Sequence, residues 1–339
     1  MPIAKFADNK IHMIIDGQFG STGKGLCADF LTRKGYIDNC GVVVSLLSPN
    51  AGHTFYISGT KHVTHMLPVA AIVGDDRSTI YIAAGSVINE KLLRHEIEVH
   101  NIDVRRVVIH PCAAVISDDH KHTECTTDSV RQIGSTLSGT GAARVAKLNR
   151  ENCVAKFSRT LRDTFDVREL DLHNLMDASC GVFVETGQGY SLGIDQQFYP
   201  YVTSRNVTPA AVLADVGVHP AYLGEIVMCV RTYPIRVANP DNGTSGKFYN
   251  DSTEVTWDDV GVPAEYTTVT NKLRRVATFS ETQYARATNE IRPSHVFLNF
   301  ANYVDSDFEE TMLRVNKIKK PTWIGHGPTC DDVTYYQKN

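Results

Sequence analysis

The sequence predicts an α/β fold in which helices flank a mainly parallel central sheet. Short apolar runs of strand length alternate with segments of helical periodicity along the chain. The first apolar run leads directly into a glycine-rich turn and then a helix, which is the order of a βα unit. Neither an internal repeat nor a low-complexity linker interrupts the pattern. Residues 1–339 are therefore expected to form one domain.

The expected elements follow in chain order. Ile11–Asp16 is a short apolar run that predicts a buried strand, and Lys24–Lys34 has apolar residues four apart, which predicts a helix capped by Gly35. A further helix is expected at Asn89–His100, and the Asn-, Pro- and Gly-rich segment Ala238–Gly246 is expected to be an exposed loop. The other expected strands are Gly41–Leu47, Thr79–Ala83, Val107–His110, Val182–Glu185, Glu225–Arg231 and His295–Phe300.

Composition and charge exclude several classes of protein. The net charge of −4 argues against a protein that coats nucleic acid, which usually needs a basic face. No apolar run approaches the roughly 18 residues of a membrane span, and the N-terminus lacks the apolar stretch of a secretory signal. The eight cysteines form no Cys-x-x-Cys pair, which leaves a zinc site unsupported. We expect reduced core cysteines in a cytoplasmic protein.

The loop Asp16–Gly25 carries the strongest local signal for a ligand. Its glycines allow backbone N–H groups to approach phosphate oxygens, and the start of the next helix favours an anion there. Lys24 adds a cation suited to a triphosphate. The loop is not a standard Walker A motif, because five residues separate Gly17 from Gly23 and Gly25 stands where Ser or Thr would bind magnesium. The alternative is a glycine-rich turn that binds nothing.

Two further loops combine glycine with polar side chains. Asn50–Thr54 places His53 beside a glycine, where it could donate a proton or stabilise charge near neutral pH. Gly134–Gly141 carries clustered hydroxyls that suit a phosphate or a sugar. Taken alone, His53 is more often a structural histidine, and Gly134–Gly141 is equally typical of a solvated loop.

Polar segments of two kinds follow in the second half of the chain. Glu185–Gly189 and Tyr199–Asn206 are rich in glycine, hydroxyl and amide groups. Thr267–Arg275 ends on basic side chains, among them Lys272 and Arg274, which could bind a substrate carboxylate. The alternative for this last segment is a solvated basic loop.

Together, these segments resemble the adenylosuccinate synthetase family. The family motif Gly-x-Gln-Trp-Gly-Asp-Glu-Gly-Lys-Gly matches Gly17–Gly25 with substitutions, and Asn-Ala-Gly-His-Thr matches Asn50–Thr54 outright. Gly-Ala-Gln-Gly matches Thr186–Gly189 loosely, and Tyr-Pro-Tyr-Val-Thr-Ser matches Tyr199–Ser204 residue for residue. These blocks occur in family order as far as Gly325–Pro328, so the resemblance covers nearly the whole chain. The chain is shorter than most cellular members and must lack some peripheral elements.

The resemblance implies a P-loop NTPase-like adenylosuccinate synthetase fold and a ligase reaction in two steps. A nucleoside triphosphate with Mg²⁺ phosphorylates the purine O6, and the amino group of L-aspartate then displaces that phosphate. The first step needs stabilisation of charge on the transferred phosphoryl group. The resemblance gives catalytic roles to Ser21, Lys24 and His53, with Ser21 and the Gly52 carbonyl as metal ligands.

The other implied roles follow residue by residue from the matched motifs. The residues implied to bind the nucleoside triphosphate are Gly20, Thr22, Gly23, Lys24, Gly25, Gly52, His53, Thr54, Asn302, Gly327 and Pro328. Those implied to bind the acceptor nucleotide are Ser21, Asn50, Ser135, Thr136, Arg150, Gln188, Thr203 and Val237. Those implied to bind aspartate are Thr270, Asn271, Lys272 and Arg274. Arg150, or alternatively Lys147, matches an arginine that reaches the partner subunit's site, which implies a homodimer.

Three departures from the family pattern bear on the substrates. Ser21 stands where the family has an Asp that acts as base for the purine N1 proton and as a magnesium ligand. Asn299–Asn302 replaces the guanine-reading element Thr-Lys-x-Asp, and Lys272 replaces the first arginine of the aspartate loop. Viral members that use deoxyguanylate (dGMP) to make 2-aminoadenine precursors carry a similar loss of that Asp. With the Asp lost, water, the phosphate or His53 has to take the N1 proton.

The physical argument for these substrates rests on Ser21 and Asn302. The purine 2-amino group projects beside N1 and would crowd a carboxylate, whereas a serine leaves room and its hydroxyl can accept a hydrogen bond. Asn302 offers one donor and one acceptor, which matches adenine better than guanine, and Phe300 adds stacking area. The sequence therefore predicts dGMP as acceptor and ATP rather than GTP as donor, with dATP as an alternative to ATP.

Two alternative functions stay open at this point. One is an ordinary adenylosuccinate synthetase acting on inosinate (IMP), and the other is a nucleotide-binding regulator that lost catalysis with its Asp. The segment Asp118–His122 looks like a set of metal ligands, but we interpret it as a solvated surface on a loop. Neither nucleic acid nor a membrane is expected as a partner, and the expected location is the cytoplasm, that of the host for a viral protein.

Overall fold

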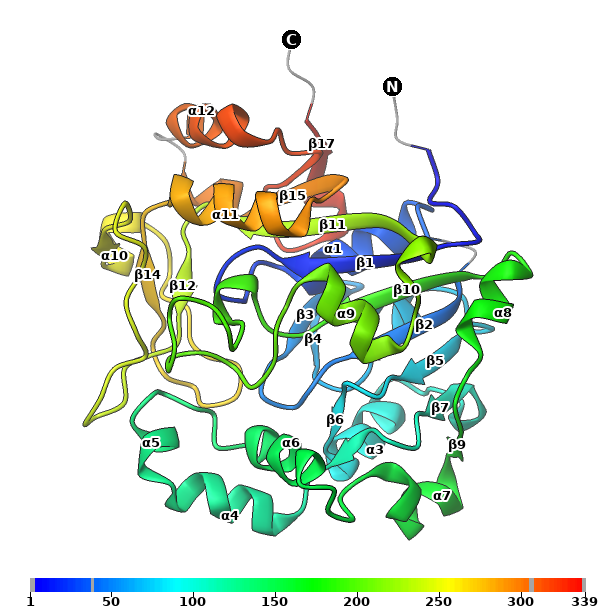
Figure 1. Cartoon of the computed structure of the whole chain (residues 1–339). Helices are drawn as coiled ribbons and strands as arrows, with labels where there is room; N and C mark the ends of the chain where they lie inside the picture. The colour runs from blue at the N-terminus through cyan, green and yellow to red at the C-terminus, as the bar shows by residue number, and fades with distance from the viewer. Residues whose placement is uncertain (1–3, 38–39, 305–307, 337–339) are drawn as a thin grey trace.

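A ten-stranded sheet runs through the protein (Figure 1). The structure is a computed structural model that describes residues 4–37, 40–304 and 308–336. In spatial order the strands are β17 (Val333–Tyr335), β16 (Trp323–Gly325), β15 (His295–Asn299), β11 (Leu223–Arg231), β1 (Ile11–Asp16), β10 (Gly181–Thr186), β2 (Cys40–Leu46), β5 (Thr79–Ile82), β7 (Val107–Ile109) and β9 (Asp166–Val167). Every neighbouring pair is parallel except β16 and β17. The predicted α/β fold with a mainly parallel sheet is confirmed.

Helices cover both faces of this sheet. Successive side chains of β1 alternate between the two cores, since Ile14 belongs to one and Met13 and Ile15 belong to the other. The first core is closed by α1 (Lys24–Arg33), α2 (Val69–Val73), α3 (Glu90–Val99) and α7 (Arg159–Thr164). The second is closed by α8 (Leu172–Asp177), α9 (Pro209–Val216), α11 (Glu281–Ile291) and α12 (Phe308–Ile318). Burial on both faces explains why the strands read as continuous apolar runs in the sequence.

Smaller elements lie around the main sheet. Three short sheets are formed by β3 (His53–Ile57) with β4 (Thr60–Thr64), by β6 (Val87–Ile88) with β8 (Ala114–Val115), and by β12 (Ile235–Arg236), β14 (Arg275–Ala277) and β13 (Glu254–Val255). Further helices are α4 (Asp118–Thr126), α5 (Asp128–Arg131), α6 (Thr140–Leu148) and α10 (Trp257–Val260). In Figure 1, α4, α5 and α6 gather at the bottom of the view, below the sheet.

Several other expectations are tested by these elements. The segment Asp118–His122 is indeed solvated, but it lies on helix α4 rather than on a loop, because Ser117 and His120 cap that helix. In the part of the chain that the structure describes, no group of three His, Cys, Asp or Glu side chains could hold a metal. The eight cysteines are free thiols, as expected, yet only Cys27 and Cys229 are buried and Cys125 is exposed. None of the described helices combines the length and apolar character that a membrane span requires.

The position of β1 defines where a ligand can bind. It lies between β10 and β11, and all three strands run in the same direction. Their carboxyl ends therefore meet at one edge, which is where open α/β sheets bind ligands. The glycine-rich loop leaves this edge after Asp16, and Thr186 and Arg231 end the two neighbouring strands.

Candidate active site

The glycine-rich loop is folded around the buried carboxylate of Asp16. One oxygen, Oδ1, accepts hydrogen bonds from the backbone N–H groups of Gln18 at 2.9 Å and Gly20 at 3.1 Å. The other, Oδ2, accepts from the Thr22 hydroxyl at 2.6 Å and from Lys24 Nζ at 3.0 Å. Because the Asp16 and Lys24 side chains are both buried, each neutralises a charge that would be costly alone. Lys24 Nζ also donates to the Gln188 carbonyl at 2.9 Å, and Lys24 still lines the cavity described below.

Two glycines of the loop are required by close packing. A Cβ atom on Gly23, which has φ of 84°, would lie 1.9 Å from Asn299 Nδ2. A Cβ atom on Gly25 would lie 2.3 Å from the carbonyl oxygen of Thr54 on β3. Gly25 therefore stands where a Walker A loop has Ser or Thr because the hairpin β3–β4 passes too close for any side chain.

His53 is held by a carboxylate from the central sheet. It begins strand β3, and its Nδ1 lies 3.0 Å from Oε2 of Glu185 on β10. The other Glu185 oxygen accepts the backbone N–H of Ala70 at 2.6 Å. Since an ionised carboxylate can only accept, Nδ1 carries a proton. His53 Nε2 is buried and has no hydrogen-bond partner in the described chain, and it faces the cavity described next.

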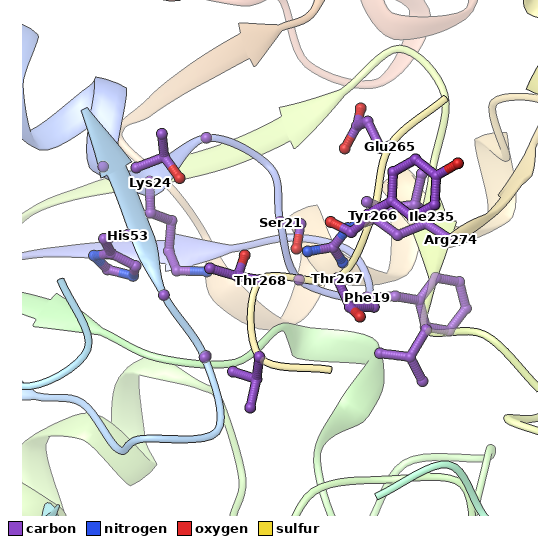
Figure 2. Close-up of a pocket in the computed structure, with 18 of the residues that line it drawn as sticks. Phe19, Ser21, Lys24, His53, Ile235, Glu265, Tyr266, Thr267, Thr268 and Arg274 are labelled. Atoms are coloured by element: carbon purple, nitrogen blue, oxygen red, sulfur yellow. The ribbon is translucent and has the colours of Figure 1, made fainter. Parts of the chain in front are cut away.

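A cavity of about 810 Å³ lies at the carboxyl edge of the sheet. Figure 2 shows Lys24 and His53 on one side of it, Tyr266, Arg274 and Phe19 on the other, and Ser21 between them. The volume falls within the range of small-molecule sites. Cations, hydroxyls, amides and aromatic rings all line it, which suits ligands that carry phosphates and flat bases.

The structure brings most of the expected site residues to this one cavity. Those that line it are Gly20, Ser21, Gly23, Lys24, Gly25, Asn50, Gly52, His53, Thr54, Thr136, Gln188, Val237, Thr270, Asn271, Arg274, Asn302, Gly327 and Pro328. Those that do not line it are Thr22, Ser135, Arg150, Thr203 and Lys272. The Thr22 hydroxyl is directed to Asp16 instead, and Lys272 is exposed outside the cavity.

The hydroxyl-rich loop Gly134–Gly141 is only partly available to a ligand. Glu124 of α4 accepts the backbone N–H groups of Gly139 and Gly141, each at 2.7 Å, and that of Ala142 at 3.2 Å. A side-chain carboxylate thus occupies the start of α6, where helices often bind anions. Thr136 remains at the cavity wall.

Arg274 presents a cation to the cavity from the opposite side. Its Nε donates to the Tyr266 carbonyl at 3.1 Å, and its terminal nitrogens have no hydrogen bond to the described residues. Burial lowers the pKa of Arg274 to about 10, against the opposing effect of Glu265, so the guanidinium stays charged at neutral pH. Arg275, in contrast, is bound to Glu254 and points away. Of the basic side chains in this segment, Arg274 is the one placed to bind a carboxylate.

Sequence reasoning missed several residues that line the cavity. Phe19, Leu192 and Ile235 are apolar, while Glu265 and Tyr303 are polar and cluster near Phe300. Glu265 and Tyr266 directly precede the threonine-rich segment that the sequence singled out, so adjacency was the available signal. Lys61, on the second strand of the hairpin, adds a further cation that no motif marked.

Comparison with known proteins agrees with this geometry. The family model for adenylosuccinate synthetase matches residues 13–156 and 152–305. The N6-succino-2-amino-2'-deoxyadenylate synthase of Salmonella phage PMBT28 is 36% identical, over 96% of this chain and 98% of that protein. The adenylosuccinate synthetase of Methanococcus maripaludis is 31% identical, over 79% of this chain and 77% of that protein.

A solved structure is also similar to this chain along nearly its whole length. The succinoaminodeoxyadenylate synthetase of cyanophage S-2L, bound to dGMP and to dATP as an energy donor, is 35% identical with a TM-score of 0.88. The match covers 97% of this chain and 96% of that one. The resemblance first inferred from the sequence motifs is confirmed. The chain belongs to the adenylosuccinate synthetase family.

Proposed function

We propose that this protein is an ATP-dependent ligase that joins L-aspartate to C6 of dGMP, giving 2-amino-2'-deoxyadenylosuccinate for the synthesis of 2-aminoadenine DNA precursors. The observation that carries the proposal is Ser21. It lines the cavity, its side chain is exposed, and its hydroxyl makes no hydrogen bond within the described chain. Relatives with similarity along nearly the whole chain include a phage synthase named for the 2-amino product and a phage synthetase solved with dGMP.

Lys24 and His53 act on the transferred phosphoryl group. Both face the cavity from neighbouring elements, α1 and β3. Lys24 offsets the growing negative charge as the γ-phosphoryl passes from ATP to the purine O6. The unpartnered Nε2 of His53 can donate to the phosphoryl oxygens, and the Glu185 carboxylate stabilises the positive charge on the ring.

The second step needs aspartate beside the activated purine. Arg274, Thr270 and Asn271 line the cavity and bind the aspartate carboxylates, and Figure 2 shows Arg274 near Ser21. The amino group then attacks C6, the C6–N bond forms and the C6–O bond breaks, and inorganic phosphate leaves. Gln188, Asn50, Thr136 and Val237 hold the acceptor nucleotide, and the Gln188 amide is fixed by a 2.8 Å bond to Asn50 Oδ1.

Mg²⁺ fits the oxygen atoms at this site. The Ser21 hydroxyl and the Gly52 carbonyl are hard donors that line the cavity, whereas Asp16 already uses both of its oxygens within the loop. Such a sparse set suits Mg²⁺, which takes most of its ligands from phosphates and water. When bound, the metal supplies positive charge that neutralises the phosphates.

The assembly we propose is a homodimer of single-domain subunits in the cytoplasm of a host cell. Lys147 donates to the Ala84 carbonyl of its own chain at 2.7 Å, so it is already engaged. Arg150 lies exposed just after α6, and its side chain has no hydrogen bond in the described chain. These contacts favour Arg150 over Lys147 as the residue that reaches the partner's site in the proposed dimer.

A competition among acceptors tests the function. With ATP and aspartate fixed, dGMP, GMP and IMP are offered together, and the three products are separated and measured. We expect the wild type to favour dGMP, because a site that bonds the 2-amino group leaves a polar group unpaired with IMP. Ser21→Asp should shift the preference towards IMP. Preferred use of IMP by the wild type would identify an ordinary adenylosuccinate synthetase, and no aspartate-dependent release of phosphate would identify a nucleotide-binding regulator.

A further inference from the structure

Arg231 is a fully buried cation to which the proposed reaction assigns no role. It is the last residue of β11, beside the glycine-rich loop, and its side chain is 0% exposed. Its backbone N–H donates to Gln18 Oε1 at 2.9 Å, and its carbonyl accepts from Gln18 Nε2 at 3.1 Å. The guanidinium continues past the loop, and Nη1 donates to the Ser21 carbonyl at 3.1 Å. Backbone and side chain of Arg231 thus both bind the loop.

The same guanidinium lies against the ring of Phe300. Its central carbon is 3.9 Å from the Phe300 ring centroid and 5.8 Å from that of Tyr303. Phe300 and Tyr303 also line the cavity, as do Asn302 and Pro328, which the sequence assigned to the triphosphate. A planar cation stacked on an aromatic ring fixes the plane of that ring, and the contact is stronger when desolvated. Arg231 is thus in contact with an aromatic ring of the cavity wall.

Glu265 completes the cluster and balances its charge. Nη2 of Arg231 contacts Oε1 of Glu265, Nη1 lies 3.2 Å from Oε2, and the Tyr303 hydroxyl donates to Oε1 at 3.1 Å. Burial would raise the pKa of Glu265, but Arg231, with Arg274 and Tyr303, outweighs this and lowers it. Glu265 is thus ionised at neutral pH and holds Arg231 with two parallel bonds.

Two strained backbone positions meet at this one side chain. Ser21 has φ of 55° and Phe300 has φ of 59°, both in the left-handed region that side-chain-bearing residues rarely adopt. Such conformations persist only where the surroundings over-determine them. Arg231 touches the carbonyl of the first residue and the ring of the second.

We propose that Arg231 is a positioning residue that couples the two nucleotide sites, by holding Ser21 at the acceptor purine and Phe300 at the donor base in one fixed arrangement. Glu265, which Tyr303 holds by a hydrogen bond, keeps the guanidinium of Arg231 over the Phe300 ring. The inference rests on the proposed function, which assigns Ser21 to the acceptor, and on the expectation from the sequence that Phe300 stacks on the donor base. The inference goes further than the proposed function in one respect: a change at Arg231 should alter both the affinity for ATP and the rate of the chemical reaction.

Single-site variants separate the two halves of this coupling. Phe300→Leu should raise KM for ATP about tenfold with little change in kcat, because it removes stacking area alone. Ser21→Ala should lower kcat and raise KM for dGMP. Measured at saturating Mg²⁺, which offsets the lost metal ligand, its KM for ATP should stay close to that of the wild type. Arg231→Lys keeps the positive charge but loses the planar face of the guanidinium and one hydrogen bond. It should therefore raise KM for ATP about tenfold and also lower kcat about tenfold. KM for aspartate should stay at the wild-type value.

Double variants give the decisive measurement. If Arg231 acts through Phe300, the effect of Arg231→Lys on KM for ATP should be largely lost in the Phe300→Leu background. If it acts through Ser21, its effect on kcat should shrink likewise in the Ser21→Ala background. Arg94→Lys is the control, since Arg94 also pairs with a glutamate, Glu90, and lies over a phenylalanine, Phe165, but does not line the cavity. It should leave all kinetic constants unchanged.

A merely structural role predicts a different pattern. Arg231→Lys would then lower Tm and the active fraction, while kcat and KM per active site stay normal, and that result would overturn the proposal. Multiplicative effects in both double variants would overturn it too. If Arg231→Lys does not fold, Glu265→Gln and Tyr303→Phe provide the same test with smaller shifts in the same direction. Wild-type turnover with dGMP is scored separately, so a failure of the proposed function is distinguished from a failure of the coupling.

Discussion

His53 and Glu185 form a buried pair in which Nδ1 of the histidine lies 3.0 Å from Oε2 of the glutamate. The two residues come from different elements, the hairpin strand β3 and the central strand β10. The carboxylate fixes the tautomer and the plane of the ring, and it directs Nε2 into the cavity. Glu185 therefore fixes the orientation in which His53 faces the cavity.

We predict that Glu185→Gln lowers kcat by about tenfold to 100-fold, with KM for ATP and for dGMP little changed. The amide keeps an acceptor for the Ala70 N–H but loses the charge that stabilises a positively charged ring. His53→Ala should cost about 100-fold or more in turnover, and the double variant should be no worse than His53→Ala alone. Steady-state kinetics on folded protein measure this. Additive losses would show that Glu185 acts independently of His53.

Asn302 should read the donor base. It lines the cavity beside Phe300, and its amide has one donor and one acceptor group to match N1 and the 6-amino group of adenine. We predict a preference for ATP over GTP of about tenfold or more in kcat/KM, since guanine would leave a polar group unpaired. Asn302→Asp should narrow or reverse that preference. Equal efficiency with both triphosphates in the wild type would remove Asn302 from this role.

Complementation between two inactive variants tests the homodimer and the reach of Arg150. Lys24→Ala and Arg150→Ala should each abolish most turnover. In a heterodimer of the two, one site combines an intact Lys24 with the partner's intact arginine. Mixing equal amounts after dissociation should therefore restore about a quarter of the wild-type activity, because half of the dimers are mixed and each holds one complete site. Lys147→Ala serves as the control, and no recovery on mixing would argue against a shared site.

Acid should destabilise the fold partly through His12. Burial lowers the pKa of His12 below its ordinary value of 6.5. Its Nδ1 accepts the Glu225 N–H at 2.8 Å, so protonation would break that bond. The unfolded chain binds this proton more tightly, hence stability is fully present above pH 6.5 and falls as the pH drops below it.

Urea unfolding between pH 5 and 7.5 measures this dependence. Replacing His12 by Gln should reduce the slope of unfolding free energy against pH by up to about 1.4 kcal/mol per pH unit, which corresponds to one proton. His95→Gln, at an exposed position on α3, is the control and should leave the slope as in the wild type. An unchanged slope in the His12 variant would assign the acid sensitivity to other groups.

The main sheet was predictable because its strands are buried on both sides. Ile11–Asp16 and Glu225–Arg231 read as strands from their apolar runs alone, and the structure places both at the centre of the sheet. The hairpin β3–β4 was not expected, since Thr60–Thr64 is partly exposed and carries no apolar run. Yet this hairpin holds His53, so the motif was found without the element that positions it.

The candidate site also has parts that the sequence predicts and parts that it does not. The glycine-rich and hydroxyl-rich loops can be recognised from short stretches of the sequence. In the structure, most of them line one cavity. The contacts that hold them are long-range: Arg231 and Glu265 are 34 positions apart, and His53 and Glu185 are 132 apart. No local pattern encodes such pairs, because the partners become neighbours only when the sheet assembles.

The bonds of Asp16 have a consequence for how fast nucleotides can bind. The carboxylate and the reciprocal bonds between Gln18 and Arg231 already hold the glycine-rich loop in shape. The conformational entropy of ordering this loop is therefore lost during folding and not on each encounter with ATP. Association should then be limited by diffusion and orientation, without a slow rearrangement of the loop, and differences in affinity among triphosphates should lie chiefly in their dissociation rates.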